Sequence, residues 1–395
     1  MNANLRNGVF TSLARLLDEQ RTGLLEANRA DAAACPPGDD VILDRLKLDD
    51  KKIDRMISSV RTVLAADDPV DKVISSHTRP DGLRIENRRV PFGTVLIIFE
   101  ARPDVCIEAA IIALKAGNRI LLKGGKEARN TNLFLADLWR QALEENQGAT
   151  QTVRYLDISR EETRELIRGE CEKFDIVVPR GGEALIDFVV TNSSSPVIVS
   201  GRGNNFLYVD RDADFEMALK IALNGKQRLS VCNALDKILI DSALPEIETR
   251  MGRLVEAFRA AGIEVFGDET VRAIVASVCP VESEEIWYEE FLSAKLVVGI
   301  IADLGEAIEK INKYSGGHSA AIITNDPEKA ELFLSEVDCA AVYHNASIRF
   351  TDGGEFGLGA EIAISTQKLH FRGPLGAEHL MTNKWFVFGN GQIRE

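Results

Sequence analysis

The chain has 395 residues, more than one ordinary hydrophobic core accommodates, and this length predicts two or three domains. Apolar residues make up 45% and charged residues 27%, a balance that excludes wholesale disorder. The formal net charge of −14 argues against nucleic acid as a partner, because a protein that binds a polyanion normally has a basic surface. A small anionic substrate is not excluded, since it needs only a local cluster of donors.

Membrane spans, disulfides and metal sites are not predicted. No apolar run approaches the roughly 18 residues of a membrane span, and the first residues indicate an amphipathic helix without the apolar core of a secretory signal. The six cysteines are scattered and form no CxxC pair, which indicates reduced thiols in a cytoplasmic protein. Five histidines without HExxH spacing predict no metal.

The first part of the chain is predicted to be helical and then to form a hairpin. Apolar residues recur at helical spacing over residues 1–65, with a break at Pro36-Pro37-Gly38. In residues 73–90, a Pro-Asp-Gly turn separates two polar, strand-like arms, which predicts a hairpin that projects from the body. The residues alone leave open whether it is an oligomerisation arm or a solvated surface flap.

From residue 91 onward, apolar strands alternate with helices. The strand 95–100 is followed by a helix over 104–118, a strand at 119–123 and a helix over 127–146. The later strands are expected at TVRYLD, DIVV (175–178), LYVD, KILID, IEVFG, KLVVGII and AAIIT. Strands this apolar, separated by helices, predict an α/β fold with parallel sheets covered on both faces.

Three strand ends carry glycines that could contact a phosphate. They are Lys123-Gly124-Gly125, Arg180-Gly181-Gly182, and the segment SGRGNNF at 200–206. A helix N-terminus offers free N–H groups and a positive dipole end, and glycines let a pyrophosphate approach the backbone. A strand-Gly-Gly-helix sequence is also an ordinary tight turn, and none of the three matches the Rossmann fingerprint, so both readings stay open.

Cys232 stands out among the cysteines because it lies in a polar loop, NGKQRLSVCNALDK, with Lys226 and Arg228 close in sequence to favour a thiolate. It is a candidate nucleophile, although an inert core thiol is the commoner role for a cysteine. Two glycine-rich stretches, 314–324 with His318 and 345–366, suggest a backbone-lined pocket or a long structural turn. His318 itself is predicted to be structural.

Taken together, these stretches resemble one family. VPFGTVLIIFEARPDV, LLKGGKEA, PRGGEALI, SVCNALDK, EFLSAK and GGEFGLGAEIAISTQKLH are similar, in order and over nearly the whole chain, to the gamma-glutamyl phosphate reductases. These are proline-biosynthesis enzymes of the aldehyde dehydrogenase superfamily. The resemblance implies an aldehyde dehydrogenase-like fold with two parallel-sheet α/β domains and a small β oligomerisation arm. It also implies a homo-oligomer, and it implies glutamate 5-kinase as the enzyme that supplies the substrate and as a possible physical partner.

The resemblance also implies domain boundaries. Residues 1–226 would form the NADP-binding domain, interrupted by the hairpin arm near 73–90. Residues 227–365 would form the catalytic domain that carries Cys232. Residues 366–395 would return to the cofactor domain and to the oligomerisation arm.

Site residues follow position by position from the same resemblance. Cys232 would attack gamma-glutamyl phosphate, expel phosphate and leave a thioester, which NADPH reduces to glutamate 5-semialdehyde. Lys123 would contact the adenosine ribose, and Lys126 the 2′-phosphate of NADP, where NAD-using relatives carry glutamate. The implied cofactor set is Lys123, Lys126, Gly181, Gly182 and Glu290, the last on the nicotinamide ribose. The substrate candidates are Arg102, Asn345, Ser347 and Arg349.

Absences and departures from the family pattern bear on the chemistry. VSGRGNN has no carboxylate where hydrolytic relatives carry a glutamate base, which favours reduction over hydrolysis. Asn205 and Phe206 replace the usual Cys-His pair, and Asp104 replaces a common asparagine, adding negative charge near an anionic substrate. Two alternatives remain: a reductase of another acyl donor such as an acyl-CoA, and a non-catalytic assembly subunit with the same fold.

Overall fold

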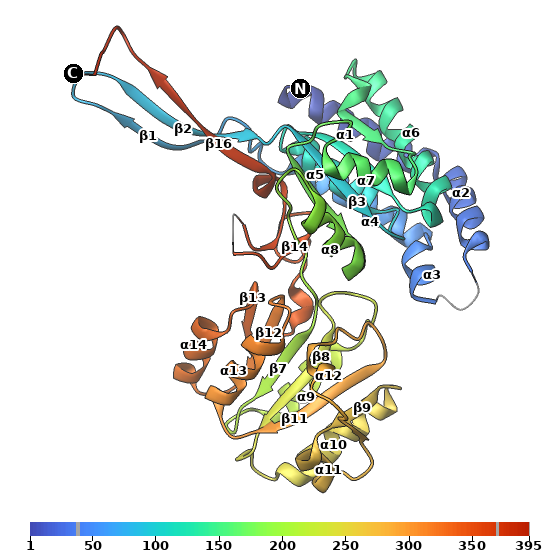
Figure 1. Ribbon diagram of the computed structural model, residues 1–395, viewed down its shortest axis with the longest axis vertical. Helices are drawn as coiled ribbons and strands as arrows, with labels where there is room; N and C mark the ends of the chain where they lie inside the picture. Colours follow the sequence, from blue (N-terminus) through green and yellow to red (C-terminus); the bar gives the residue numbers. More distant parts are fainter. Residues whose placement is uncertain (37–39, 369–370, 395) are drawn as a thin grey trace. The chain divides into compact units, whose positions relative to one another are not determined.

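The structure is a computed structural model that describes residues 1–36, 40–368 and 371–394 (Figure 1). The chain forms two compact units. The first unit comprises Met1–Ser200, Gly357–Ala363 and Pro374–Glu395, and the second comprises Gly201–Phe356 and Ile364–Gly373. Each unit has its own parallel sheet, as the alternation of strands and helices predicts.

The sheet of the first unit has four parallel strands in the order β5-β4-β3-β6. Their bounds are β3 Thr94–Phe99, β4 Arg119–Gly124, β5 Val153–Tyr155 and β6 Ile176–Arg180. The connecting helices are α5 Val105–Lys115, η1 Lys126–Ala128, α6 Arg129–Glu145, η2 Thr150–Thr152, α7 Arg160–Arg168 and α8 Glu183–Asn192. The strands and helices predicted between residues 91 and 180 are therefore confirmed, with small shifts at their ends.

Both faces of this sheet are buried. Val95, Ile97 and Phe99 of β3 lie in the core that also contains apolar residues of α1, α4, α5 and α6. Leu96 and Ile98, which alternate with them, lie in a second core with apolar residues of α7 and α8. A strand whose successive side chains enter two cores has to be apolar throughout, and this is why the sequence at 95–99 shows no polar alternation.

The N-terminal helices cover one of these faces. They are α1 Ala3–Glu19, α2 Arg21–Ala34, α3 Asp40–Leu46 and α4 Asp50–Ala65. The helical prediction for residues 1–65 is confirmed over the described residues. α2 ends before Pro36, whereas Pro37 and Gly38 of the predicted break lie outside the described residues.

The sheet of the second unit has seven parallel strands in the order β10-β9-β11-β8-β7-β12-β13. Their bounds are β7 Asn205–Val209, β8 Leu235–Asp241, β9 Glu264–Gly267, β10 Cys279–Pro280, β11 Lys295–Ile301, β12 Ser319–Ile323 and β13 Ala341–His344. The helices are α9 Phe215–Gly225, α10 Ile247–Ala260, α11 Glu269–Ile274, α12 Glu285–Tyr288, α13 Leu304–Tyr314, α14 Pro327–Glu336 and η3 Ile348–Phe350. Apolar residues of α9 and α10 cover one face, and those of α13 and α14 cover the other.

The division of the chain differs from the predicted boundary at 226/227, because it falls between Ser200 and Gly201. β7 pairs with β8 on one side and with β12 on the other, so residues 201–226 cannot leave the second sheet without splitting it. The predicted boundary at 365/366 also moves. Residues 364–373 stay with the second unit, and the chain returns to the first unit at Pro374.

A separate three-stranded antiparallel sheet, which we call the arm, belongs to the first unit (Figure 1). Its strands are β1 Val73–Thr78, β2 Arg84–Pro91 and β16 Met381–Phe388, with β2 in the middle. The remaining short elements of the C-terminal part are β14 Ile364–Ser365, β15 Gly373–Pro374 and η4 Ala377–Leu380. The predicted hairpin and its pairing with the C-terminal strand are confirmed.

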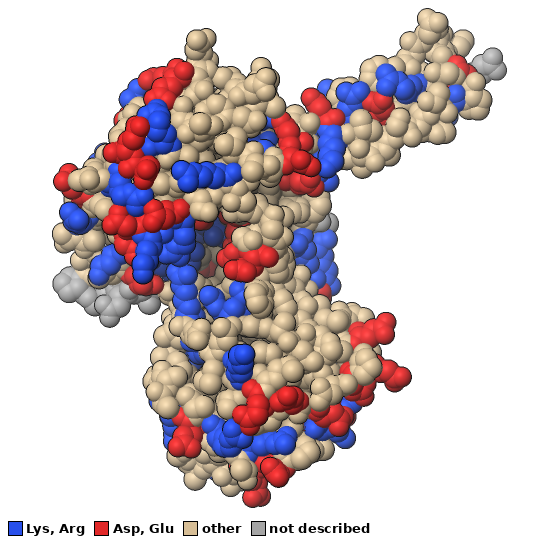
Figure 2. All heavy atoms as spheres, turned by 180° about the vertical axis from the view of Figure 1, so that it is seen from behind, with Lys and Arg blue, Asp and Glu red and all other residues tan. Residues whose placement is uncertain are grey.

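The surface carries both charge signs. Figure 2 shows acidic and basic side chains interspersed on the face drawn, and both colours also occur along the arm. Across residues 1–36, 40–368 and 371–394, no helix is both long and apolar enough to cross a membrane. Within these described ranges, no group of three or more His, Cys, Asp or Glu side chains is arranged to hold a metal ion.

Candidate active site

Cys232 lies in a loop, residues 226–234, that leads from α9 into the amino end of β8; we call it the nucleophile loop. The thiol residue is half-buried. Asn205, the first residue of the neighbouring strand β7, holds this loop in place through hydrogen bonds from its side chain to the backbone. The two Nδ2 hydrogens of Asn205 are shared among three carbonyl oxygens, those of Cys232 at 2.7 Å, Ala234 at 2.7 Å and Gly203 at 2.8 Å. A buried amide thereby fixes the backbone on both sides of Asn233.

Gly203 packs directly against the backbone of Cys232. A Cβ atom added at Gly203 would lie 1.9 Å from the Cys232 carbonyl oxygen and 2.6 Å from its Cα. Backbone atoms cannot yield as the end of a flexible side chain can, so only glycine fits here without displacing the loop. The glycine-rich segment 200–206 thus serves the nucleophile loop and does not resemble a nucleotide loop in its contacts.

Arg349 lies within electrostatic reach of the thiol, and Arg228 lies within reach of Arg349. Arg349 donates through Nη1 to the Asn233 side-chain oxygen, and its own carbonyl accepts from the Asn233 amide at 3.1 Å. Burial and then the charge of Arg228 lower the pKa of the Arg349 guanidinium, while the charge of an ionised Cys232 raises it. The Arg349 cation therefore favours a thiolate and would also attract the phosphate of an incoming substrate.

Lys226 does not add to this effect as its position in the sequence suggests. Its Nζ lies 2.6 Å from the carboxylate of Asp236, and both side chains are buried. Burial lowers the pKa of the Lys226 amine, and the Asp236 charge opposes that shift. Lys226 is therefore paired with a core carboxylate, whereas Arg349 interacts electrostatically with Cys232.

The segment of residues 289–291, which carries Glu290, lies near the amino ends of β8 and β11. Glu290 is half-buried. The neighbour after it, Phe291, donates its N–H to Asp236 at 2.9 Å, and the neighbour before it, Glu289, accepts from Lys237 Nζ at 2.8 Å. Cys232 and Glu290 thus enter from loops at the same edge of one parallel sheet.

Two further predicted residues, Ser347 and Asn345, have structural partners. Ser347 donates to the Asn224 side chain at 2.7 Å, near the end of α9. Asn345 follows β13 and exchanges two hydrogen bonds with the backbone of Thr324, 3.1 Å and 2.9 Å long. Since Thr324 follows the carboxyl end of β12, Asn345 lies at the opposite sheet edge from Cys232.

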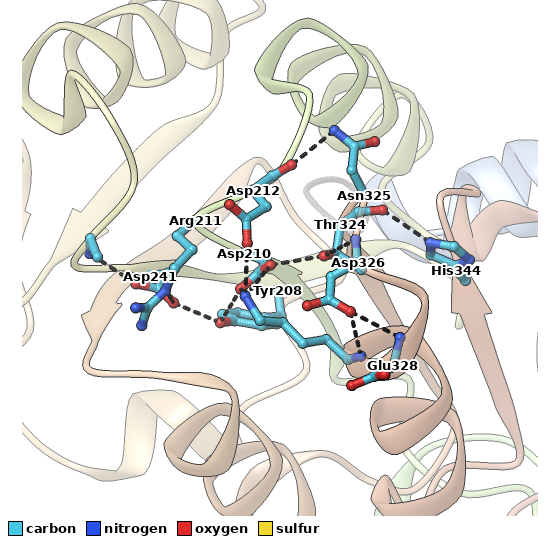
Figure 3. Close-up of polar contacts among 12 residues, drawn as sticks. Tyr208, Asp210, Arg211, Asp212, Asp241, Thr324, Asn325, Asp326, Glu328 and His344 are labelled. Atoms are coloured by element: carbon cyan, nitrogen blue, oxygen red, sulfur yellow. Dashed lines mark hydrogen bonds and ion pairs between the residues drawn. The ribbon is translucent and has the colours of Figure 1, made fainter.

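That carboxyl edge holds a polar cluster of its own (Figure 3). Asp210 accepts hydrogen bonds from Thr324 at 2.8 Å and from Lys329 at 2.9 Å, and Tyr208 donates to Asp241 at 3.1 Å. Buried Asp210 and Asp241 each have a cationic partner, Lys329 and Arg211 respectively. The cluster ties β7, β8 and β12 together and is structural.

His318 is fully buried at the start of β12, as expected for a structural histidine. Its Nδ1 lies 2.7 Å from the Ser319 hydroxyl, and burial lowers the pKa of the ring to about 4. A neutral ring that titrates this low carries no charge for substrate binding at neutral pH.

In the first unit, the predicted cofactor residues gather at the carboxyl edge of the sheet. Lys123 lies at the end of β4, and Lys126 is exposed at the start of η1. Gly181 and Gly182 follow β6 and lead into α8. β4 and β6 both pair with β3, so the two loops are separated by one strand. This is the edge at which α/β sheets bind nucleotides.

The environment of these residues fits an anionic ligand. Lys123 is half-buried and donates to the Gly124 carbonyl at 2.6 Å; burial lowers the pKa of its amine. The Gly182 N–H donates to a carboxylate oxygen of Glu100 at 2.8 Å, and a Cβ at Gly181 would lie 2.3 Å from that oxygen. The N-terminus of α8 therefore binds a carboxylate of the protein itself, and a pyrophosphate would have to take the place of Glu100 there. Arg102, in the loop after β3, lies at the same edge.

Sequence reasoning missed several of these residues. Asn205, Gly203, Asp236 and Lys237 act on the backbone of the two site segments, and Glu100 lies against the glycine loop. Each partner is distant in the sequence, so spacing could not reveal it. The adjacent charged residues Asp236 and Lys237 in the otherwise mainly apolar strand LDKILID were a visible signal, because buried charges are rare unless they have partners.

Comparison with known proteins places the chain in a family. The model of the aldehyde dehydrogenase family matches residues 44–265 and 268–359, and the chain belongs to that family. Its relatives include gamma-glutamyl phosphate reductases of Thermotoga petrophila, 43% identical over 99% of this chain and 94% of the relative, and of Clostridium beijerinckii, 44% identical over 97% and 92%. Within the aldehyde dehydrogenases, the chain belongs with the gamma-glutamyl phosphate reductases.

The fold agrees with this assignment. The crystal structure of gamma-glutamyl phosphate reductase from Thermotoga maritima superposes with a TM-score of 0.93 at 42% identity, covering 100% of this chain and 95% of that one. The predicted aldehyde dehydrogenase-like fold is therefore confirmed, with its two parallel-sheet α/β units and its β arm.

Proposed function

We propose that the chain reduces gamma-glutamyl phosphate to glutamate 5-semialdehyde and phosphate with NADPH, through a thioester on Cys232. The observation that carries the proposal is the half-buried Cys232 within electrostatic reach of Arg349, in a loop whose backbone is held by Asn205 and Gly203. In this reading the second unit is the catalytic one and the first unit binds the cofactor.

The proposed reaction consists of two successive additions to the acyl carbon of the substrate. The Cys232 thiolate forms a bond to the acyl carbon, and the bond from that carbon to the phosphate oxygen breaks, so inorganic phosphate leaves with its electron pair. NADPH held on Lys123, Gly181 and Gly182 would supply the hydride that reduces the thioester carbon. Protonation yields a thiohemiacetal, which collapses to the aldehyde and returns the thiolate. An oxyanion forms at each addition, and donors near Cys232 are needed to stabilise it.

Of the predicted substrate residues, we propose that Arg102 and Arg349 bind the substrate directly. Arg349, hydrogen-bonded to Asn233 next to the nucleophile, is suited to the phosphate, and Arg102 to a carboxylate of the amino-acid end. Ser347 acts through Asn224 and Asn345 through Thr324, so we propose that both support the loop that carries Arg349.

The cofactor is proposed to bind with its pyrophosphate on Gly181 and Gly182 and its adenosine ribose on Lys123. The exposed Lys126 would pair with the 2′-phosphate, and Glu290 of the second unit would accept from the nicotinamide ribose. The chemistry that the cofactor supplies is hydride transfer, while these residues bind and orient it.

The arm supports a proposal of homo-oligomer formation. No other strand among the described residues pairs with the outer edges of β1 and β16, and exposed apolar side chains lie on these two strands: Ile74 is 53% exposed, Trp385 58% and Val387 57%. Such edges and apolar patches are usually covered by another chain. We further propose a cytoplasmic enzyme that receives its acyl phosphate from glutamate 5-kinase, directly or through solution.

The reverse reaction tests the proposed activity, because an acyl phosphate of glutamate is too labile to handle easily. Purified protein is mixed with glutamate 5-semialdehyde, NADP and increasing inorganic phosphate, and NADPH absorbance is followed. We expect NADPH formation that saturates with phosphate. Activity without phosphate would indicate a hydrolytic dehydrogenase instead, and activity only with coenzyme A would indicate a different acyl donor.

Replacing Lys126 by glutamate tests the cofactor assignment. Lys126→Glu should raise the KM for NADPH by about tenfold and change that for NADH much less, because it sets a carboxylate against the 2′-phosphate. The matched control is Lys173→Glu, the same change at another exposed lysine of the first unit. Equal effects on both cofactors would remove Lys126 from this role.

A further inference from the structure

The core of the second unit contains two adjacent charged residues that the reaction scheme does not use. Asp236 and Lys237 lie in β8, with exposures of 1% and 0%, on a strand whose other residues are mainly apolar. Burying a charged side chain costs several kcal/mol unless partners compensate. We therefore expect the contacts of the two charged residues in β8 to have a structural or functional role.

Both charged residues hold the same segment. The Asp236 carboxylate accepts the Phe291 N–H at 2.9 Å, while its other oxygen accepts from Lys226 at 2.6 Å. Lys237 donates to the Glu289 carbonyl at 2.8 Å, and its Nζ lies 3.8 Å from the centre of the Phe291 ring. The residues on either side of Glu290 are thus both fastened to β8.

Lys237 also interacts electrostatically with Glu290. Burial lowers the pKa of the Lys237 amine to about 7, and the charge of Lys226 acts in the same direction, whereas the carboxylates of Asp236, Glu289 and Glu290 oppose the shift. Lys237 is therefore coupled to the Glu290 segment by charge as well as by its hydrogen bond to the Glu289 carbonyl.

We propose that Lys237 is a positioning residue for the cofactor: it fixes the peptide groups around Glu290, so that the Glu290 carboxylate is held ready for the nicotinamide ribose. Asp236 assists from the other side through Phe291, and Lys226 neutralises Asp236. This inference rests on the proposed function, in which Glu290 contacts the cofactor.

A double-mutant cycle tests whether Lys237 acts through Glu290. Lys237→Met should raise the KM and Kd for NADPH by about tenfold, the size of one lost charge-assisted hydrogen bond, with a smaller effect on kcat. Lys237→Arg should recover much of the affinity. In a Glu290→Gln background, Lys237→Met should have little further effect on NADPH affinity, because its route of action is already lost.

The matched control is Lys329→Met, at the opposite edge of the same sheet. Lys329 is ion-paired to buried Asp210, so its loss should lower the melting temperature without changing the KM for NADPH. An unchanged NADPH KM in Lys237→Met, an equal rise in Lys329→Met, or full additivity with Glu290→Gln would overturn the inference.

Misfolding of Lys237→Met and a lack of NADPH binding by the unmodified protein have to be distinguished from a failure of the inference. If Lys237→Met does not fold, Phe291→Leu removes the ring beneath Nζ and keeps all charges. It should raise the NADPH KM by about threefold, and no rise would count against the proposal. Failure of the unmodified protein to bind NADPH would instead refute the proposed function itself.

Discussion

Replacing Cys232 by alanine is expected to lower turnover by at least about 10⁴-fold, because neither the thiohemiacetal nor the thioester can form without the thiol. NADPH binding should stay nearly intact, since the predicted cofactor lysines and glycines belong to the first unit. The measurement is phosphate-dependent NADPH formation in the reverse direction, together with a direct NADPH binding titration.

The matched control for this experiment is Cys171→Ala. Cys171 is exposed in the first unit and is a free thiol like Cys232, so its removal should leave turnover and binding unchanged. Substantial residual reduction by Cys232→Ala, with a normal fold, would show that another group carries the acyl transfer. Alkylation of the unmodified protein should inactivate it in step with modification of Cys232, and bound substrate should slow both.

The sequence predicts the fold well because its signals are local. The apolar run at 95–99 and the Pro-Asp-Gly turn of the hairpin need no distant partner to be recognised, and the structure has a buried strand and a two-stranded ribbon there. The boundary at 226/227 fails for the opposite reason. Whether β7 joins the first or the second sheet depends on its pairing with β8 and β12. No feature of the sequence at residues 205–209 indicates these partners.

The candidate site divides in the same way. Cys232 is visible from its polar loop, and the glycine loops from their strand-helix context. The charge on Lys226 looks available to a thiolate in the sequence, but Asp236 in the next strand takes it up at 2.6 Å. Asn345 looks like a ligand beside so many glycines, yet its amide is used on the Thr324 backbone. Partners of this kind come from tertiary packing and carry no signature in spacing.

The geometry of the nucleophile loop leads to a second large expected effect, at Gly203, which is not among the predicted substrate-binding residues. Gly203→Ala should lower turnover by about 100-fold. A Cβ placed 1.9 Å from the Cys232 carbonyl oxygen must displace the backbone that carries the thiol, and a displacement of the nucleophile by about 1 Å lowers the rate by about that factor. The clash is with backbone, so no rotamer change can relieve it. A stability loss of about 1–3 kcal/mol, typical of overpacking, is expected to accompany it.

Gly252→Ala is the matched control, since it makes the same change in helix α10 of the same unit, where an added Cβ meets nothing within 4 Å. It should leave turnover unchanged and raise stability by about 0.5–1 kcal/mol, because alanine is the better helix former. The comparison is made on kcat and on the rate of Cys232 alkylation, at a temperature where both variants are folded. A displaced thiol predicts that Gly203→Ala changes both rates together. If Gly203→Ala turns over like the unmodified protein, the close approach of Gly203 does not set the position of the nucleophile, and Asn205 would be left as the group that does.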